Sequence, residues 1–236
     1  MRFSVSRKYK QSVRPVDFFT AVTYYSFVKV MFVYPNLFGM NMLPPAIGIL
    51  NALLLEAGHE TSLFDTTNYG QWDHLDVVSD KLKEQHLNAR PFDDSRLQTS
   101  MLSSSPGDDF AMQVKAKTPD LLAFSVTEDM YPNGIELLRY LDPNSRPVTL
   151  MGGVFPTFAP KLTLDKGMGM VDFVLTGEGE GGIVAFCDHL DKGKDLKKIP
   201  GIAMYLPDGV FYKNALPALV NPNLVPLPNY DFFEES

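Results

Sequence analysis

Five short runs rich in β-branched and aromatic residues recur along this 236-residue chain, and segments with a helical spacing of apolar residues lie between them. The runs occupy residues 29–34, 61–65, 121–126, 148–151 and 173–175. Continuous apolar runs of this length indicate strands that are buried on both faces. Their alternation with helices predicts an α/β fold, in which a parallel sheet with right-handed crossovers is covered on both faces.

Five such units favour a flavodoxin-like, doubly wound sheet with strand order 2-1-3-4-5 and a ligand crevice at the switch point between its first and third strands. The expected helices span residues 45–57, 73–85, 110–117, 132–141, 158–164 and 181–190. After residue 200, two apolar runs flank Pro207-Asp208-Gly209, which predicts a hairpin. Four later prolines predict an extended linker. The expected organisation is an N-terminal extension (1–27), a Rossmann-like domain (28–200), and a hairpin with a Pro-rich linker (201–236).

Composition excludes several classes of protein. The net charge of −7 argues against a nucleic-acid partner. The single cysteine, Cys187, excludes a disulfide framework and any cysteine-ligated iron–sulfur cluster within these residues. The uncharged stretch 30–55 is interrupted by Pro35, Pro44 and Pro45, so we expect no membrane span. No targeting segment is convincing, which makes the cytoplasm the expected compartment.

The loops after the first, third, fourth and fifth strands should meet at the carboxyl edge of the sheet. They span residues 35–42, 125–131, 152–157 and 176–180. Ser125 and Thr127 offer hydroxyls at a strand end, and Gly152-Gly153 removes side chains where a ligand or backbone could approach. Any one of these loops could be only a tight turn. Four convergent loops of this kind predict a binding site.

Other chemistry fits these residues less well. Gly177, Gly179 and Gly182 match GxGxxG, but the motif follows the fifth strand and its glutamates would repel a pyrophosphate. A phospho-receiver needs acids at the end of the first strand, where Tyr34-Pro35-Asn36 has none. The four histidines show no ligand spacing and are expected to have surface or capping roles. A flavodoxin-like signalling or interaction domain without a cofactor remains the alternative, because this fold hosts many functions.

An ordered set of motifs resembles the cobalamin (B12)-binding domain of B12-dependent radical S-adenosylmethionine (SAM) enzymes. The set comprises Tyr34-Pro35-Asn36, the PPAIGIL run over residues 44–50 with the LLEAGH run over residues 54–59, Pro119-Asp120 followed by Ser125, Gly152-Gly153 with Pro156-Thr157, and Gly177-Glu178-Gly179-Glu180. The resemblance covers residues 28–192, and the hairpin and Pro-rich exit also fit it.

The resemblance implies a corrin ring over the carboxyl edge of the sheet and a nucleotide tail in the switch-point crevice. The residues expected to bind cobalamin are Pro35, Asn36, Leu37, Phe38, Gly39, Leu43, Ser125, Val126, Thr127, Glu128, Gly152, Gly153, Val154, Phe155, Pro156, Thr176, Gly177, Glu178 and Gly179. Because the cofactor would supply the chemistry, no residue of this chain is expected to act as a general acid or base.

The sequence differs from the family pattern in two ways that affect the expected function. Many cobalamin domains carry Asp-x-His-x-x-Gly after the first strand, but residues 35–40 contain no histidine, which predicts histidine-off cobalamin. A radical SAM domain needs Cys-x3-Cys-x2-Cys, which one cysteine cannot supply. The [4Fe-4S] cluster and SAM would therefore belong to a partner catalytic domain, downstream or on a separate chain. The resemblance allows methyl transfer or anaerobic ring formation by the full enzyme.

Overall fold

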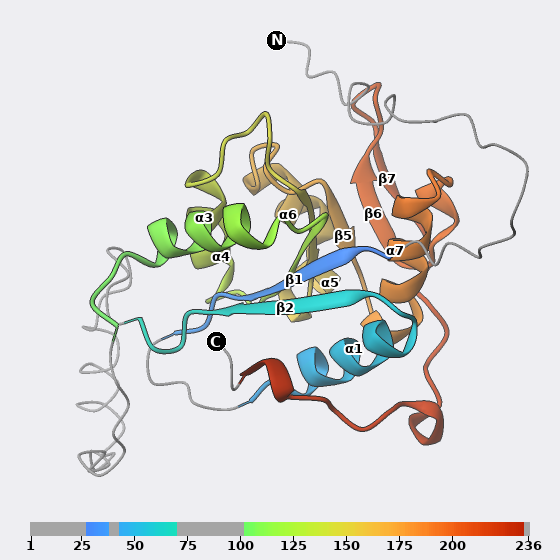
Figure 1. Cartoon of the computed structure of the whole chain (residues 1–236). Helices are drawn as coiled ribbons and strands as arrows, with labels where there is room; N and C mark the ends of the chain where they lie inside the picture. The colour runs from blue at the N-terminus through green and yellow to red at the C-terminus, as the bar shows by residue number, and fades with distance from the viewer. Residues whose placement is uncertain (1–26, 38–42, 70–101, 234–236) are drawn as a thin grey trace, which may run out of the picture.

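The computed structural model describes residues 27–37, 43–69 and 102–233, which form one seven-stranded sheet in the order β2-β1-β3-β4-β5-β6-β7 (Figure 1). The strands are β1 (Lys29–Tyr34), β2 (Glu60–Asp65), β3 (Leu121–Ser125), β4 (Val148–Gly152), β5 (Phe173–Leu175), β6 (Ile202–Tyr205) and β7 (Phe211–Lys213). The first five are parallel, in the predicted order 2-1-3-4-5. The predicted flavodoxin-like fold class is confirmed.

The predicted hairpin extends this sheet. β6 pairs antiparallel with β5, and β7 pairs antiparallel with β6. β6 therefore starts where β5 ends, since Ile202 pairs with Leu175. β7 runs back and returns the chain to the carboxyl edge of the parallel strands.

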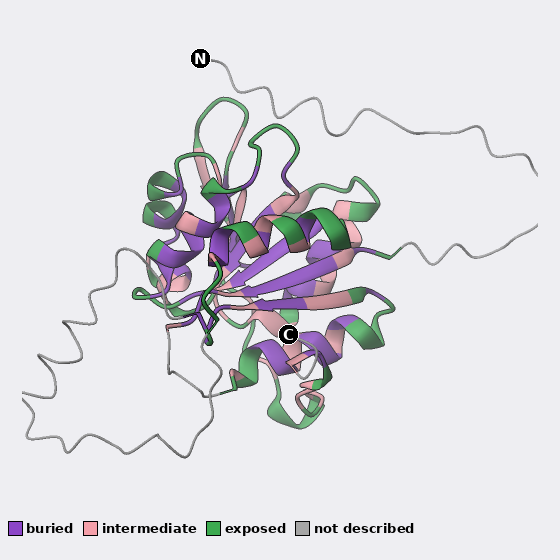
Figure 2. Ribbon diagram, turned by 60° about the vertical axis from the view of Figure 1, so that its left-hand side comes forward, coloured by how far each residue is buried: buried purple, intermediate pink, exposed green. Residues whose placement is uncertain are grey.

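Helices cover both faces of the sheet, whose strands are buried while the outer helix faces are exposed (Figure 2). The helices are α1 (Pro45–Glu56), α3 (Pro106–Lys117), α4 (Tyr131–Arg139), α5 (Val154–Phe158), α6 (Pro160–Lys166) and α7 (Ile183–Asp191). Buried residues of α3, α4 and α6 belong to one core, and those of α1 and α7 belong to the other. The predicted helix 73–85 lies outside the described residues.

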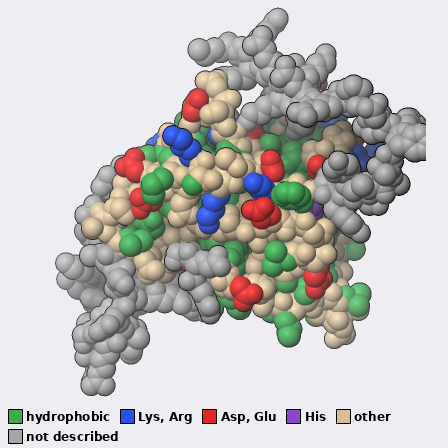
Figure 3. All heavy atoms as spheres, in the orientation of Figure 1, with side chains coloured by type: hydrophobic (Ala, Val, Ile, Leu, Met, Phe, Trp, Pro, Cys, Tyr) green, Lys and Arg blue, Asp and Glu red, His purple; other side chains and the backbone are tan. Residues whose placement is uncertain are grey.

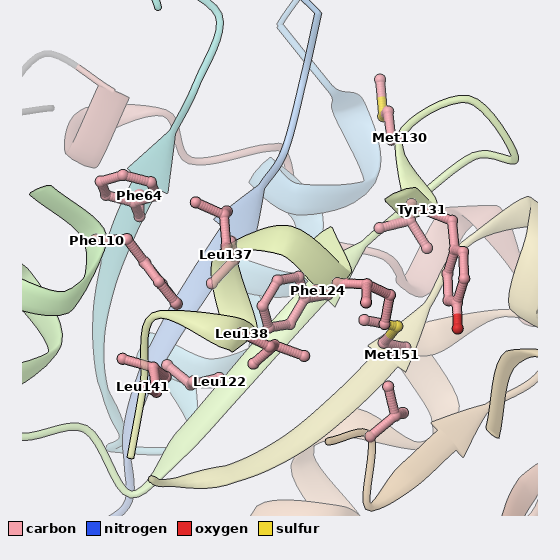
Figure 4. Packing of buried hydrophobic residues seen from close by; sticks show 14 of the residues in the cluster. Phe64, Phe110, Leu122, Phe124, Met130, Tyr131, Leu137, Leu138, Leu141 and Met151 are labelled. Atoms are coloured by element: carbon pink, nitrogen blue, oxygen red, sulfur yellow. The ribbon is translucent and has the colours of Figure 1, made fainter. Parts of the chain in front are cut away.

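The core under α3 and α4 is rich in aromatic rings (Figure 4). Phe110 lies 5.0 Å from Phe64 and 6.4 Å from Phe124, measured between ring centroids. Burying a side chain of this size stabilises a fold by roughly 1.5–3 kcal/mol. This face is therefore closed by dense apolar packing.

Helix α3 is longer than the sequence predicts, because it begins at Pro106 rather than Phe110. The Ser105 hydroxyl accepts a hydrogen bond from the Asp108 backbone N–H, as an N-cap residue does. Proline then occupies the first helical turn, where its missing N–H costs nothing. The sequence predicts a single helix over residues 158–164, but the structure has two short helices there, α5 and α6, within residues 154–166.

The Pro-rich segment packs back onto the domain. Pro228 and Tyr230 lie so close to Gly48 of α1 that a Cβ there would be 2.8 Å and 2.6 Å from them. The Asn229 backbone N–H donates to the Gly48 carbonyl (2.9 Å). Phe232 lies edge-on to Phe32 of β1, at 5.9 Å between ring centroids. Residues 214–233, which we call the tail, therefore hold α1 from its outer side.

Candidate functional site

Three residues form a row across the carboxyl edge of the sheet on the α1 face. Ser125 pairs in register with Gly152, and Tyr34 occupies the neighbouring position on β1. The preceding row on this face is fully apolar and buried: Phe32, Ala123 and Leu150. In the last row, by contrast, Ser125 and Gly152 are half-buried. On this face, β3 and β4 therefore end in small residues that are only half-buried, beside the larger Tyr34 of β1.

The two adjacent glycines that follow β4 have different roles. A Cβ at Gly152 would meet nothing closer than the Leu175 carbonyl oxygen, at an ordinary 3.7 Å. A Cβ at Gly153 would lie 2.5 Å from the Val126 carbonyl oxygen, and its φ of +108° is a conformation that side chains rarely adopt. Gly153 thus lets the backbones of the β3 and β4 loops approach each other. Only Gly152 leaves space beside Ser125.

The Ser125 hydroxyl is available to a ligand. No described residue forms a side-chain hydrogen bond with it. Helix α1 and the β5 loop are in contact, since a Cβ on Gly179 would lie 3.2 Å from Leu50. The sequence predicts a ligand crevice at this switch point, and the Ser125 hydroxyl and the side-chain-free Gly152 are the features that such a crevice would use.

The end of β1 is held by a polar network. The Asn36 side-chain amide donates to the Thr67 hydroxyl (2.8 Å), and that hydroxyl donates to a carboxylate oxygen of Asp65 (2.6 Å). The Thr66 hydroxyl donates to the Asn36 carbonyl (2.8 Å). Burial raises the pKa of Asp65, although the hydrogen bonds from Thr67 oppose that shift. Burial, and then the charge of Asp65, raise the pKa of Tyr34.

The β5 loop is turned toward the hairpin and the tail. The buried Thr176 hydroxyl donates to the Gly201 carbonyl (2.8 Å), so it faces away from Ser125. The Gly177 N–H donates to the Thr157 hydroxyl (3.1 Å) and thereby joins this loop to α5. Gly177 has a φ of +82° and lies against Pro217 of the tail. These contacts fix the loop, and the Glu178 side chain stays exposed.

The described candidate residues surround the carboxyl edge at different depths. Exposed ones are Leu43, Thr127, Glu128, Gly153, Val154 and Glu178; half-buried ones are Leu37, Ser125, Gly152, Phe155, Gly177 and Gly179; buried ones are Pro35, Asn36, Val126, Pro156 and Thr176. Phe38 and Gly39 lie outside the described residues. The sequence interpretation missed Asp65, Thr66 and Thr67. The signal was present, because this polar run directly follows a strand that ends at the same edge.

Among the described residues, no histidine or cysteine side chain is found at this edge, and His74 and His86 lie outside the described residues. His59, expected at the surface or in a cap, is buried at the opposite end of the sheet, where its Nδ1 accepts a hydrogen bond from the Val28 N–H (3.2 Å). Cys187 is buried in the α7 core, as predicted, and burial raises its pKa to about 12. The described residues contain no group of three or more His, Cys, Asp or Glu side chains placed to hold a metal ion.

The surface carries both signs of charge on the face that Figure 3 shows. On the face shown in Figure 3, basic and acidic side chains of the described residues are interspersed with hydrophobic ones, so no basic patch dominates it. Among the helices that the structure describes, none is long and apolar enough to cross a bilayer.

The fold is that of a flavodoxin-like α/β domain, and the candidate residues lie around the carboxyl edge that contains its topological switch point. Comparison with known proteins shows which flavodoxin-like domains this chain is similar to. The B12 binding domain family matches residues 75–186. An uncharacterized methyltransferase of Pyrococcus horikoshii is 29% identical over 124 residues, which is 52% of this chain and 27% of that protein.

Solved structures share the fold at low sequence identity. The cobalamin-dependent SAM radical enzyme OxsB with aqua-cobalamin bound superposes with a TM-score of 0.65 at 16% identity, over 89% of this chain and 25% of that one. The radical SAM methyltransferase TsrM from Kitasatospora setae, with cobalamin and a [4Fe-4S] cluster bound, has a TM-score of 0.53 at 16% identity, over 86% and 31%.

Residues 75–186 therefore match the B12 binding domain family, and the fold of the chain is similar to that of solved B12-dependent radical SAM enzymes. It spans about a quarter of the length of the curated relatives that it matches.

Proposed function

We propose that this chain binds cobalamin in a histidine-off form and presents it to a radical SAM catalytic domain. The nucleotide tail would occupy the crevice beside Ser125 and Gly152. The observation that carries the proposal is the half-buried Ser125 hydroxyl, without a described partner, next to a glycine that leaves space, in a chain that matches the B12-binding family.

The residues present suit this cofactor. Ser125 can donate a hydrogen bond to the nucleotide base, and Gly152 makes room for a planar ring beside it. Leu50 and the β5 loop would shield that ring from water. The exposed Glu178 carboxylate can accept hydrogen bonds from amide groups at the rim of a corrin. Acceptors of this kind are unfavourable for a phosphate, so the acidic loop favours a ligand edged with amides.

The corrin's lower face would lie against the end of β1. In residues 35–37, Pro35 and Asn36 are buried and Leu37 is half-buried, and none of the three is a usual cobalt ligand. Bound cobalamin supplies a cobalt centre that can carry a methyl group or transfer electrons. The chain would bind it, orient it and restrict water, while the [4Fe-4S] cluster and SAM would be held by a partner domain.

Retention of hydroxocobalamin through gel filtration tests this function. We expect the purified chain to elute with cobalamin absorbance, and the ultraviolet–visible spectrum to lack the features of base-on or imidazole-ligated cobalamin. Complete loss of the colour from a folded protein would overturn the proposal and favour a cofactor-free interaction domain. An imidazole-ligated spectrum would overturn the histidine-off form, and a base-on spectrum would place the nucleotide base on cobalt rather than in the crevice.

A further inference from the structure

We propose that Thr67 and Asp65 act as positioning residues for the cobalamin site by holding Asn36 at the end of β1. This inference rests on the proposed function. Neither residue belongs to the loops after β1, β3, β4 and β5 that carry the candidate binding residues. Both follow or end β2, the strand at the edge of the sheet.

The geometry forms a continuous chain of donors and acceptors. Thr67 donates its backbone N–H (2.8 Å) and its hydroxyl (2.6 Å) to the same Asp65 oxygen. Because the hydroxyl proton is committed to Asp65, the hydroxyl oxygen is left to accept from the Asn36 amide (2.8 Å). The carboxylate thus fixes the orientation of the hydroxyl, and the hydroxyl fixes the orientation of the amide.

The backbone at the end of β1 is held as closely as the side chain. The Thr66 N–H and hydroxyl donate to the carbonyls of Tyr34 (3.1 Å) and Asn36 (2.8 Å), respectively. From the opposite side, the Asn133 amide of α4 donates to the Pro35 carbonyl (3.4 Å). Asn36, Thr66 and Asn133 are all buried. Three consecutive carbonyls are therefore held by hydrogen-bond donors before the chain leaves the strand.

This arrangement has a specific consequence for a cobalamin without a histidine ligand. Where a histidine binds cobalt, the metal bond itself fixes the distance between the loop and the corrin. Without that bond, the distance depends on how firmly the end of β1 is held. Tyr34 lies next to Ser125, and Asn36 comes two residues after Tyr34 in the chain. A shift of Asn36 would therefore move the surface beneath the ring relative to the crevice.

Thr67→Val tests the assignment, because valine keeps the shape and removes the hydroxyl. We expect hydroxocobalamin retention, measured by equilibrium dialysis, to weaken about tenfold, the equivalent of one or two buried hydrogen bonds. The electron paramagnetic resonance spectrum of the reduced cob(II)alamin form should broaden, because the lower face of the ring would no longer meet a single environment. Thr67→Ser keeps the hydroxyl and should restore both properties.

Thr149→Val is the matched control. Thr149 is a fully buried threonine whose hydroxyl bonds to Arg146 at the amino end of β4. Its loss should lower stability without changing the affinity or the spectrum. If Thr67→Val does not fold, Thr67→Ala removes the hydroxyl without adding an atom and serves in its place.

The outcomes separate the two proposals. The positioning role alone is overturned if the wild-type chain retains cobalamin and a folded Thr67→Val or Thr67→Ala variant shows the same affinity and the same spectrum. Equal effects of Thr67→Val and Thr149→Val on affinity also overturn it, because the change would then reflect general destabilisation. A wild-type chain that retains no cobalamin overturns both the proposed function and this inference.

Discussion

Two polar sites at opposite ends of the sheet differ in how completely their groups are paired. At the amino end, the Arg146 guanidinium donates to both carboxylate oxygens of Asp172 (2.6 and 2.9 Å), to the Gly169 carbonyl and to the Thr149 hydroxyl. At the carboxyl end, the Ser125 hydroxyl has no described partner and Gly152 leaves space. The comparison separates a polar cluster that stabilises the fold from a hydroxyl that, in the proposed function, binds a ligand.

The largest expected effect lies at the amino end. Arg146→Ala leaves the Asp172 carboxylate and the buried Thr149 hydroxyl without this partner, and should cost about 3 kcal/mol of stability. Urea denaturation measures the loss. Arg139→Ala is the control, because its pair with Glu136 is largely exposed and should be worth less than about 0.5 kcal/mol. Similar losses in the two variants would show that the amino end is not the stability centre.

Gly152 and Gly153, which are adjacent at the carboxyl end, should differ in their effects on stability and on ligand binding. Gly153→Ala should destabilise the fold by about 2 kcal/mol, since its Cβ would collide with the Val126 backbone at a positive φ. Gly152→Val should change stability by less than about 1 kcal/mol yet abolish hydroxocobalamin retention, because the side chain fills the space beside Ser125. Retention by a folded Gly152→Val variant would place the nucleotide tail elsewhere.

Loss of the Ser125 hydroxyl should have a smaller effect. Ser125→Ala removes one hydrogen bond to the proposed ligand and should weaken hydroxocobalamin binding about fivefold, the equivalent of roughly 1 kcal/mol. Stability should hardly change, because the hydroxyl has no described partner to lose. Ser145→Ala, which removes an exposed hydroxyl that bonds to Asp142, serves as the control. Equal affinities for both variants would argue against a contact at Ser125.

The smallest expected effect is a pH dependence at the amino end. Burial lowers the pKa of His59, against the opposing charges of Asp188 and Asp191, while Lys192 adds to the lowering. A histidine kept neutral in the fold takes up a proton more readily when unfolded. Stability from this group is therefore complete above about pH 6.5 and declines as the pH falls below it.

Urea denaturation at pH 7.5 and pH 5.5 measures this loss. His59→Gln retains an acceptor for the Val28 N–H without the titration. The decline from pH 7.5 to pH 5.5 should therefore be smaller in this variant than in the wild type. Parallel profiles for the two proteins would exclude His59 as the source.

The strands, their order and the loops at the carboxyl edge could be predicted, because buried strands leave continuous apolar runs and parallel topology places their ends together. The function of the two glycines could not be separated, since the sequence does not show that only Gly153 abuts the Val126 backbone. The network from Asp65 to Asn36 was missed because it joins loops 30 residues apart. The sequence shows the polar run after β2, but it does not show that these side chains reach Asn36.

The packing of the tail could not be predicted either. A proline-rich segment predicts an extended chain, but it does not show which surface that chain lies against. Gly48 made the packing possible, yet in the sequence it is only a helical glycine. The sequence also gives no sign of the role of Asn51, whose buried amide donates to Asn229 and accepts from the Thr61 hydroxyl. Helix α1, β2 and the tail are thus joined through one side chain.

That junction has a consequence for how the domain opens. Helix α1 cannot separate from the sheet without also releasing Asn229, Tyr230 and Phe232, so the helix and the tail belong to one cooperative unit of local unfolding. Amide hydrogens in both should exchange with solvent at a common rate. Any molecule seated against the inner side of α1 would slow that exchange in the tail as well, although it never touches it.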